Sequence, residues 1–309
     1  MKKLLLIVGP TAVGKTELSI KLAKKFNGEI ISGDSMQIYK SLDVGTAKIS
    51  KSEMQGVKHH LIDIKNINER YTVSDFVSDA KKCIDDITKR HKLPIIVGGT
   101  GFYLQSLLSD FNFGGDEYNN DNLRNDYHNY ALKYGQHKLW EKLYNLDPAS
   151  AKKIPEQNER RVIRALEVFD KTGKKFSEQN DDYNKNEYDY FSICLNTERN
   201  LLYNRINRRV LLMIKNNLEE EARWLYEQGG NNIPAGKGIG YREFYLYFDN
   251  DITLDEVIEN IQKDSRHYAK RQLTWFRNKM DVTWYDIIKN HNNIYNIEND
   301  VNKWINYKK

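Results

Sequence analysis

The sequence predicts an α/β protein: a parallel sheet of the P-loop NTPase type, covered by helices and interrupted by a helical insertion. In the first 110 residues, short apolar runs at 3–8, 29–32 and 94–99 alternate with amphipathic stretches. These runs are continuously apolar, which is typical of parallel strands buried on both faces. GPTAVGKT at 9–16 fits the pattern GxxxxGKS/T between the first run and the first amphipathic stretch, the context that a phosphate-binding loop requires.

The amphipathic stretches between and after these strands predict helices at 14–26, 74–90 and 102–108. Ser74 is the expected N-cap of the second helix, because its hydroxyl can accept a hydrogen bond from the first turn. The apolar face of that helix comprises Phe76, Ala80, Cys83, Ile84 and Ile87.

A change of character after residue 110 predicts where the insertion begins. Residues 111–126, FNFGGDEYNNDNLRND, read as a polar loop. The chain is then helical in pattern until FSICL at 191–195, with an exit linker near its end. We therefore predict that residues 1–113 form the first part of the core, 114–190 a helical insertion, and 191–309 the completion of the core.

The last part of the chain predicts further core elements. Residues 198–228 read as one long helix with an apolar stripe, and GKGIGY at 236–241 reads as a glycine-rich loop. A helix near 253–279, a strand at 282–286 and a terminal helix complete the prediction.

Composition excludes several classes of protein. The chain has 309 residues, of which 39% are hydrophobic and 29% charged, as in folded proteins. Cys83 and Cys194 are its two cysteines, so neither a disulfide framework nor a thiolate zinc site is expected. The apolar run at 4–8 is too short for a signal peptide core, and no run approaches a membrane span. We expect a cytoplasmic protein, and its net charge of +5 permits a polyanionic partner.

The phosphate loop predicts a site for a di- or triphosphate. Gly9 and Gly14 allow the backbone to curl so that successive N–H groups point at an anion, and the following helix adds its positive end. Lys15 supplies a point charge, and the hydroxyl of Thr16 can ligate Mg²⁺. The predicted diphosphate-binding residues are Gly9, Pro10, Thr11, Ala12, Val13, Gly14, Lys15 and Thr16.

Asp34 follows the second strand and should lie beside the phosphate loop, because ligands of parallel sheets bind at the carboxyl ends of strands. It is a candidate metal ligand or general base, or alternatively a carboxylate that only caps its own loop. The third strand runs into Gly98, Gly99 and Thr100 without an acid, and HLID at 60–63 is a weak substitute. This favours group transfer over a motor or switch ATPase.

Seven motifs then make a resemblance specific. The chain resembles the tRNA dimethylallyltransferases, also called tRNA isopentenylpyrophosphate transferases, over nearly its whole length and least at 111–155. Without a Cys/His cluster near its C-terminus it resembles the bacterial form. The motifs are GPTAVGKT, GDSMQIYKSLDVGTAK (33–48), HHLID (59–63), VGGTGFYLQSLL (97–108), ERRVIRALEV (159–168), GIGYRE (238–243) and RHYAKRQLTWFR (266–277).

The resemblance implies an activity. The family transfers a dimethylallyl group from dimethylallyl diphosphate to the exocyclic amine of the adenosine 3′ of the anticodon. The phosphate loop is then expected to hold an isoprenoid diphosphate with Mg²⁺, and Asp34 to take the proton that the amine loses. Arg209 resembles the family's arginine near the diphosphate, and Arg205 shares its helix face; a solvated helix face is the alternative.

The partner implied is the tRNA anticodon stem-loop. Ser35, Met36, Gln37 and Thr100, together with Asp34, are expected around the extruded base. Tyr39 and Tyr103 are more typical of core positions, and His59 and His60 are interpreted as structural. Two basic runs at 152–175 and 263–279, and the loop between them, supply the remaining candidates: Arg160, Arg161, Arg164, Tyr241, Arg242, Arg266 and Lys270.

Three other functions fit parts of the sequence. A small-molecule kinase explains the first 110 residues, with Asp34 accepting a hydroxyl proton. An adenylate isopentenyltransferase would perform the same chemistry on a free nucleotide, and would need no polyanion-binding surface. A non-enzymatic RNA-binding module leaves the phosphate loop unexplained. For the favoured enzyme we expect a monomer.

Overall fold

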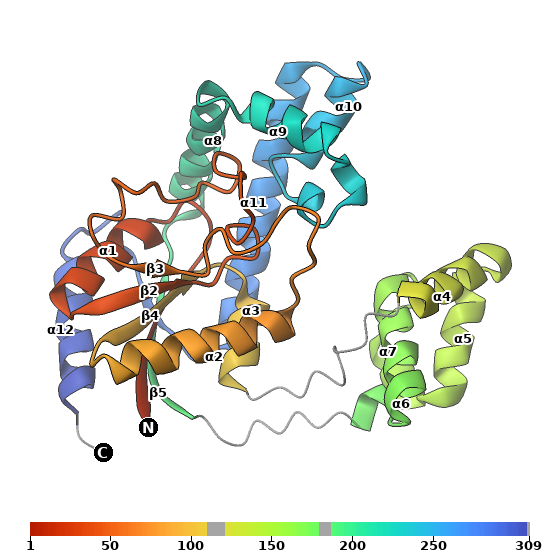
Figure 1. The fold of residues 1–309 in the computed structure, drawn as a ribbon, viewed down its shortest axis with the longest axis horizontal. Helices are drawn as coiled ribbons and strands as arrows, with labels where there is room; N and C mark the ends of the chain where they lie inside the picture. Colours follow the sequence, from red (N-terminus) through yellow and green to blue (C-terminus); the bar gives the residue numbers. More distant parts are fainter. Residues whose placement is uncertain (110–120, 179–186, 308–309) are drawn as a thin grey trace. The chain divides into compact units, whose positions relative to one another are not determined.

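The computed structural model describes residues 1–109, 121–178 and 187–307. The chain divides into two compact units (Figure 1). Unit 1 comprises Met1–Leu108 and Asn186–Lys309, and unit 2 is Ser109–Lys185. No helix within the described ranges is long and apolar enough to span a membrane.

A parallel sheet forms the centre of unit 1. Among the described residues its strand order is β3-β2-β4-β1-β5-β6, and every pairing is parallel. The central strand β1 pairs on one side with β4, at Leu5 and Ile95, and on the other with β5, at Leu5 and Phe191. The strands are β1 (Lys2–Val8), β2 (Gly28–Ser32), β3 (His59–His60), β4 (Leu93–Gly98), β5 (Tyr188–Leu195) and β6 (Thr283–Tyr285).

Both faces of the sheet are covered, which explains its continuously apolar strands. Leu4, Leu6 and Val8 of β1 pack into one core with helices α2 and α3, while Leu5 and Ile7 pack into a second core with α1 and α12 (Figure 1). All five side chains are fully buried. The helices of unit 1 are α1 (Lys15–Lys25), α2 (Val73–Lys89), α3 (Gly101–Leu108), α8 (Arg199–Lys215), α9 (Leu218–Glu227), α10 (Tyr245–Phe248), α11 (Leu254–Lys279) and α12 (Asn293–Asn306).

The structure confirms the predicted fold class and corrects several elements. The predicted helix at 198–228 is two helices, α8 and α9, because Asn217 adopts a left-handed conformation with φ of 66°. Asparagine tolerates this conformation better than most residues. Thr72, not Ser74, caps α2, in a reciprocal pair of hydrogen bonds with Asp75.

Three further differences concern short or polar segments. The sequence pattern missed β3, which is too short to show periodicity and pairs through His59 and His60 with β2. Strand β5 begins at Tyr188, inside the range assigned to the insertion. Residues 121–126 of the predicted loop are helical, and residues 110–120 and 179–186 lie outside the described residues.

Unit 2 is helical, with its own apolar core. One of its buried groups is a carboxylate: Glu167 is fully buried and accepts hydrogen bonds from Arg124, Arg164 and Lys171. These cations hold the pKa of Glu167 down at about 2 against the opposing effect of burial. The helices of this unit are α4 (Asp121–Tyr134), α5 (Gln136–Leu146), α6 (Pro148–Lys153) and α7 (Glu159–Thr172).

Candidate active site

A cleft lies in unit 1, where β1, β2 and β4 reach their carboxyl ends. Ligands of parallel α/β sheets bind at this edge. Its lining comes from the phosphate loop, from the loop after β2, from the turn after β4 and from helices α8 and α11. The cleft therefore collects side chains from segments that are far apart in the sequence.

The phosphate loop joins β1 to α1, as the sequence predicts. Gly9 and Gly14 have φ of 140° and 100°, values that side chains rarely allow. A Cβ on Gly9 would lie 2.5 Å from the carbonyl oxygen of Leu195, so the loop passes against the end of β5. The Lys15 ammonium donates to the carbonyls of Gly9 and Pro10, at 3.0 and 2.7 Å.

Lys15 has an unusual environment for a lysine. Burial and, to a smaller extent, the neighbouring charge of Arg209 lower the pKa of its amine to about 8, against the opposing effect of Asp34. A partly buried cation next to a second cation favours an anionic ligand, because the ligand's charge offsets both the loss of solvation and the repulsion between the cations. The geometry thus fits the predicted diphosphate site.

Two arginines of α8 reach the phosphate loop. The Nε of Arg205 donates to the carbonyl of Ala12 at 2.8 Å, and Nη1 of Arg209 lies 3.5 Å from the hydroxyl of Thr11. Arg209 lines the cleft, and burial lowers the pKa of its guanidinium. Arg209 is therefore not merely part of a solvated helix face, whereas Arg205 is exposed to solvent although it contacts the loop.

Asp34 lines the same cleft, two residues beyond the end of β2. Its Oδ1 accepts a hydrogen bond from the backbone N–H of Met36 at 2.8 Å, so the alternative of a local cap is correct for that oxygen. The carboxylate also faces the cations of the cleft: its charge raises the pKa of both Lys15 and Arg209 against burial. Capping fixes the orientation of the carboxylate and does not compete with a role in the cleft.

The other residues predicted around the base divide into two groups. Gln37 lines the cleft, whereas Ser35 and Met36 are not part of its lining. The N–H of Ser35 donates to the hydroxyl of Thr100 at 3.3 Å, which ties the loop after β2 to the turn after β4. Met36 packs against Gly238, where a Cβ would lie 2.6 Å from the methionine methyl.

Sequence analysis missed Gln272 and Tyr268, two cleft residues of α11. Gln272 is 5% exposed and bridges two loops: its Oε1 accepts from the N–H of Thr11 and its Nε2 donates to the carbonyl of Gly99, each at 3.0 Å. Burial, with the nearby Asp34, raises the pKa of Tyr268 to about 12, so its phenol remains a donor. A glutamine on the buried face of an amphipathic helix is the signal that could have identified the bridge.

Comparison with known proteins identifies the family. The family model described as IPP transferase matches residues 37–279. The chain belongs to the IPP transferase family. It is 53% identical to the tRNA dimethylallyltransferase of Ligilactobacillus salivarius, over 98% of this chain and 99% of that one. It is 54% identical to that of Pediococcus pentosaceus, over 100% of this chain and 98% of the relative.

Solved structures of IPP transferases show the same fold. The tRNA isopentenylpyrophosphate transferase of Bacillus halodurans has a TM-score of 0.75 and 45% identity, covering 99% of this chain and 97% of that one. A eukaryotic dimethylallyltransferase, described as acting on tRNA, has a TM-score of 0.82 and 29% identity, covering 99% of this chain and 80% of its own.

The structure corrects one predicted tRNA contact of this IPP transferase. Tyr241 is fully buried, and its hydroxyl donates to Glu221 at 2.7 Å, so its side chain cannot meet RNA in this conformation. Arg242 is more exposed and is paired with Glu243 and Asp264. The tyrosine of the glycine-rich segment is therefore buried and bonded to Glu221, rather than exposed to solvent.

The predicted basic contacts differ in their accessibility. Arg160 and Arg161 are exposed on α7, whereas Arg164 is committed to the buried carboxylate of Glu167. On α11, Lys270 is exposed, and Arg266 donates to the side chain of Asn207 at 2.7 Å. The exposed members remain the stronger candidates for phosphate contacts.

The lowered pKa of Lys15 predicts a pH dependence of anion binding. At a pH below its pKa of about 8 the amine is charged and attracts diphosphate, and at a higher pH the charge is lost. We expect the affinity for inorganic diphosphate to fall by up to about tenfold per pH unit above about pH 8. Titration calorimetry from about pH 7 to about pH 9 measures it. Lys15→Arg, which stays charged, should remove the slope; an equal slope in both proteins would contradict the assignment.

Proposed function

We propose that this IPP transferase transfers a dimethylallyl group from dimethylallyl diphosphate to the N6 amine of the adenosine 3′ of the anticodon in tRNA, and releases diphosphate. The observation that carries the proposal is the juxtaposition, in one cleft, of Asp34 with the cations Lys15 and Arg209. The two cations are suited to an anionic leaving group, and the carboxylate is suited to accept a proton from the acceptor. Full-length relatives named tRNA dimethylallyltransferase support this function over a kinase.

The leaving group acquires negative charge as the allylic C–O bond breaks. The phosphate-loop amides, the Lys15 ammonium and the Arg209 guanidinium would face the diphosphate oxygens and stabilise that charge as it develops. Because these groups are already held by the loop and α8, little reorganisation is needed at the moment of reaction.

The acceptor is a weak nucleophile, because the amine lone pair is delocalised into the purine ring. As the new C–N bond forms, the nitrogen must lose a proton. Asp34 is suited to accept it, since one of its oxygens is fixed by the N–H of Met36 and the carboxylate lines the cleft.

A magnesium ion fits the donor set of the cleft. Mg²⁺ takes one or two protein oxygens, with substrate phosphates and water completing its octahedron. The Thr16 hydroxyl and the Asp34 carboxylate both line the cleft, and no cluster of three acidic, histidine or cysteine ligands occurs in the described parts of the chain. We propose Thr16 as the protein ligand; the ion would neutralise diphosphate charge.

We propose that the exposed basic residues bind the anticodon stem-loop. Candidates are the α7 pair Arg160 and Arg161, and Lys270 on α11. Action on tRNA implies a cytoplasmic enzyme. We propose a monomer as the active form.

Substrate choice tests the proposal directly. Purified protein, Mg²⁺ and labelled dimethylallyl diphosphate are incubated with unmodified tRNA that carries adenosine 3′ of the anticodon, and in parallel with AMP. We expect label in tRNA alone. Label in AMP alone would assign a free-nucleotide enzyme instead. Label in neither, combined with tight ATP binding, would assign a kinase.

Removal of the proposed base should separate chemistry from binding. Asp34→Ala is expected to lower turnover by roughly 10²–10⁴-fold, because the amine then lacks its proton acceptor. Inorganic diphosphate binding, measured by calorimetry, should remain close to wild type. Asp251→Ala changes an exposed aspartate and provides the control. If Asp34→Ala turned over at the wild-type rate, Asp34 would have no role in proton transfer.

A further inference from the structure

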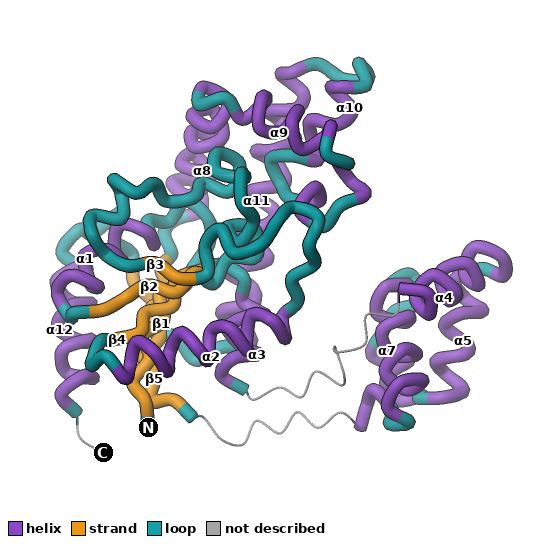
Figure 2. Tube along the Cα trace, viewed as in Figure 1, coloured by secondary structure: helices purple, strands orange, loops and turns teal. Residues whose placement is uncertain are grey.

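The segment between β2 and β3 forms one wall of the cleft without regular secondary structure. Residues 33–58 of this segment are drawn as loop in Figure 2. Gln37, Thr46 and Ala47 of this loop line the cleft. Because this loop lacks the regular backbone hydrogen bonds of a helix or a sheet, contacts with other elements must fix the position of that wall.

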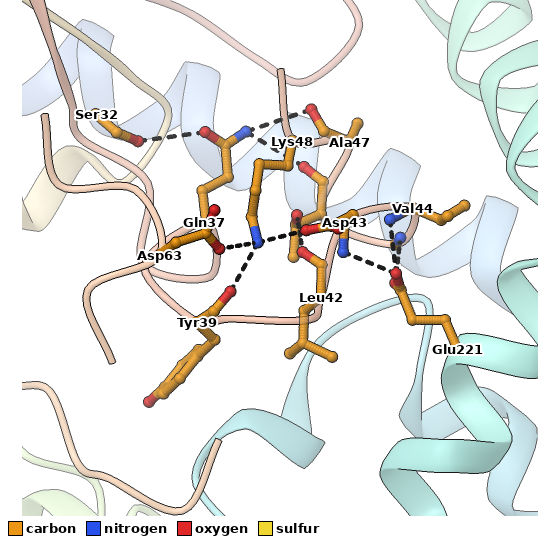
Figure 3. Close-up of polar contacts among 12 residues, drawn as sticks. Ser32, Gln37, Tyr39, Leu42, Asp43, Val44, Ala47, Lys48, Asp63 and Glu221 are labelled. Carbon is orange, nitrogen blue, oxygen red and sulfur yellow. Dashed lines mark hydrogen bonds and ion pairs between the residues drawn. The ribbon is translucent and has the colours of Figure 1, made fainter. Parts of the chain in front are cut away.

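A carboxylate from α9 anchors the loop. Glu221 accepts hydrogen bonds from three consecutive backbone N–H groups, those of Asp43, Val44 and Gly45, at 2.7, 2.9 and 2.9 Å (Figure 3). Consecutive N–H groups that converge in this way form an anion-binding nest. Here the anion is a side chain 176 residues or more away in the sequence.

Tyr241 completes the anchor. Its hydroxyl donates to the same carboxylate at 2.7 Å, and the side chain is fully buried. A Cβ on Gly45 would lie 2.5 Å from the tyrosine ring, so only glycine permits this approach. Burial and the adjacent carboxylate raise the pKa of Tyr241, which keeps the phenol protonated as a donor.

The anchored turn then orients Gln37. The amide Nε2 of Gln37 lies 3.3 and 3.5 Å from the carbonyl oxygens of Thr46 and Ala47, and its Oε1 lies 3.3 Å from the hydroxyl of Ser32 (Figure 3). Carbonyl oxygens only accept, so the NH₂ end of the amide must face the turn. The carbonyl end is thereby left toward Ser32 and the cleft.

Lys48 links the turn at residues 43–48 to neighbouring segments of the same chain. Its side chain is 5% exposed, and its ammonium donates to the carbonyl of Tyr39 and to the carboxylates of Asp43 and Asp63, at 2.8, 2.7 and 2.6 Å (Figure 3). The turn is thus held on two sides, by the partly buried carboxylate of Glu221 from α9 and by the buried ammonium of its own Lys48.

We infer that Glu221 is a positioning residue for the cleft wall formed by Gln37, Thr46 and Ala47. By holding residues 43–45 it sets the orientation of the Gln37 amide, and so the fit of the tRNA base, without touching the substrate. This inference rests on the proposed function. The phosphate loop is not held by Glu221, so the effect falls on the tRNA side of the reaction rather than on diphosphate binding.

Glu221→Gln tests the inference. The variant keeps the size of the side chain but replaces one acceptor oxygen with an NH₂ group, which cannot accept from the backbone N–H groups. We expect kcat/KM for tRNA to fall roughly 10- to 100-fold, because a displaced Gln37 would no longer position the base for reaction. KM for dimethylallyl diphosphate should stay within about twofold. Glu220→Gln, on the exposed side of the same helix, is the matched control and should match wild type.

Two outcomes would overturn the inference: unchanged kcat/KM for tRNA in folded Glu221→Gln, or an equal loss for both substrates, which would indicate a general structural role. Should that variant not fold, Tyr241→Phe removes one bond to Glu221 and should give a smaller loss of the same kind. Hydrogen exchange at residues 43–45 provides a readout without substrate and should quicken in both variants. If wild-type protein fails to modify tRNA, the proposed function fails, and the exchange measurement still tests the anchor.

Discussion

The parallel sheet imposes the constraint on which the site depends. Its strands end at one edge, so the phosphate loop after β1, the loop after β2 and the turn after β4 meet there. Gln272 holds two of these loops together, because its amide accepts a hydrogen bond from the N–H of Thr11 and donates one to the carbonyl of Gly99. Gly99 must lack a side chain for this purpose, since a Cβ there would lie 2.0 Å from the glutamine Nε2. Helix α11 thus ties two loops of the sheet edge together.

Much of the fold could be predicted from the sequence because its signals are local. Continuous apolar strands, an i, i+4 helix pattern and a glycine-rich phosphate loop each reflect burial or backbone geometry within a few residues. The failures are cases in which local pattern gives no warning. A left-handed Asn217 divides an otherwise continuous apolar stripe, and β3 is only two residues long.

The candidate site was predictable where residue chemistry and position coincide. Lys15 follows from a motif, Asp34 from a strand end and Arg209 from the family resemblance, and the structure brings all three to one cleft. Gln272 and Glu221 were not predicted, because each acts through a contact between distant segments that no spacing reveals. The family motif places Tyr241 among the RNA contacts, and the sequence does not show that its hydroxyl donates to the carboxylate of Glu221.

The measurement that tests this account most directly is diphosphate binding by Gln272→Leu. Leucine keeps the bulk of the side chain but leaves the N–H of Thr11 and the carbonyl of Gly99 without their partner. The account predicts a folded protein whose affinity for inorganic diphosphate is about 10- to 100-fold lower. Gln262→Leu, on the same helix and bonded to Asn207 instead, should bind as wild type. Wild-type affinity in Gln272→Leu would contradict the claim that α11 holds the phosphate loop in place.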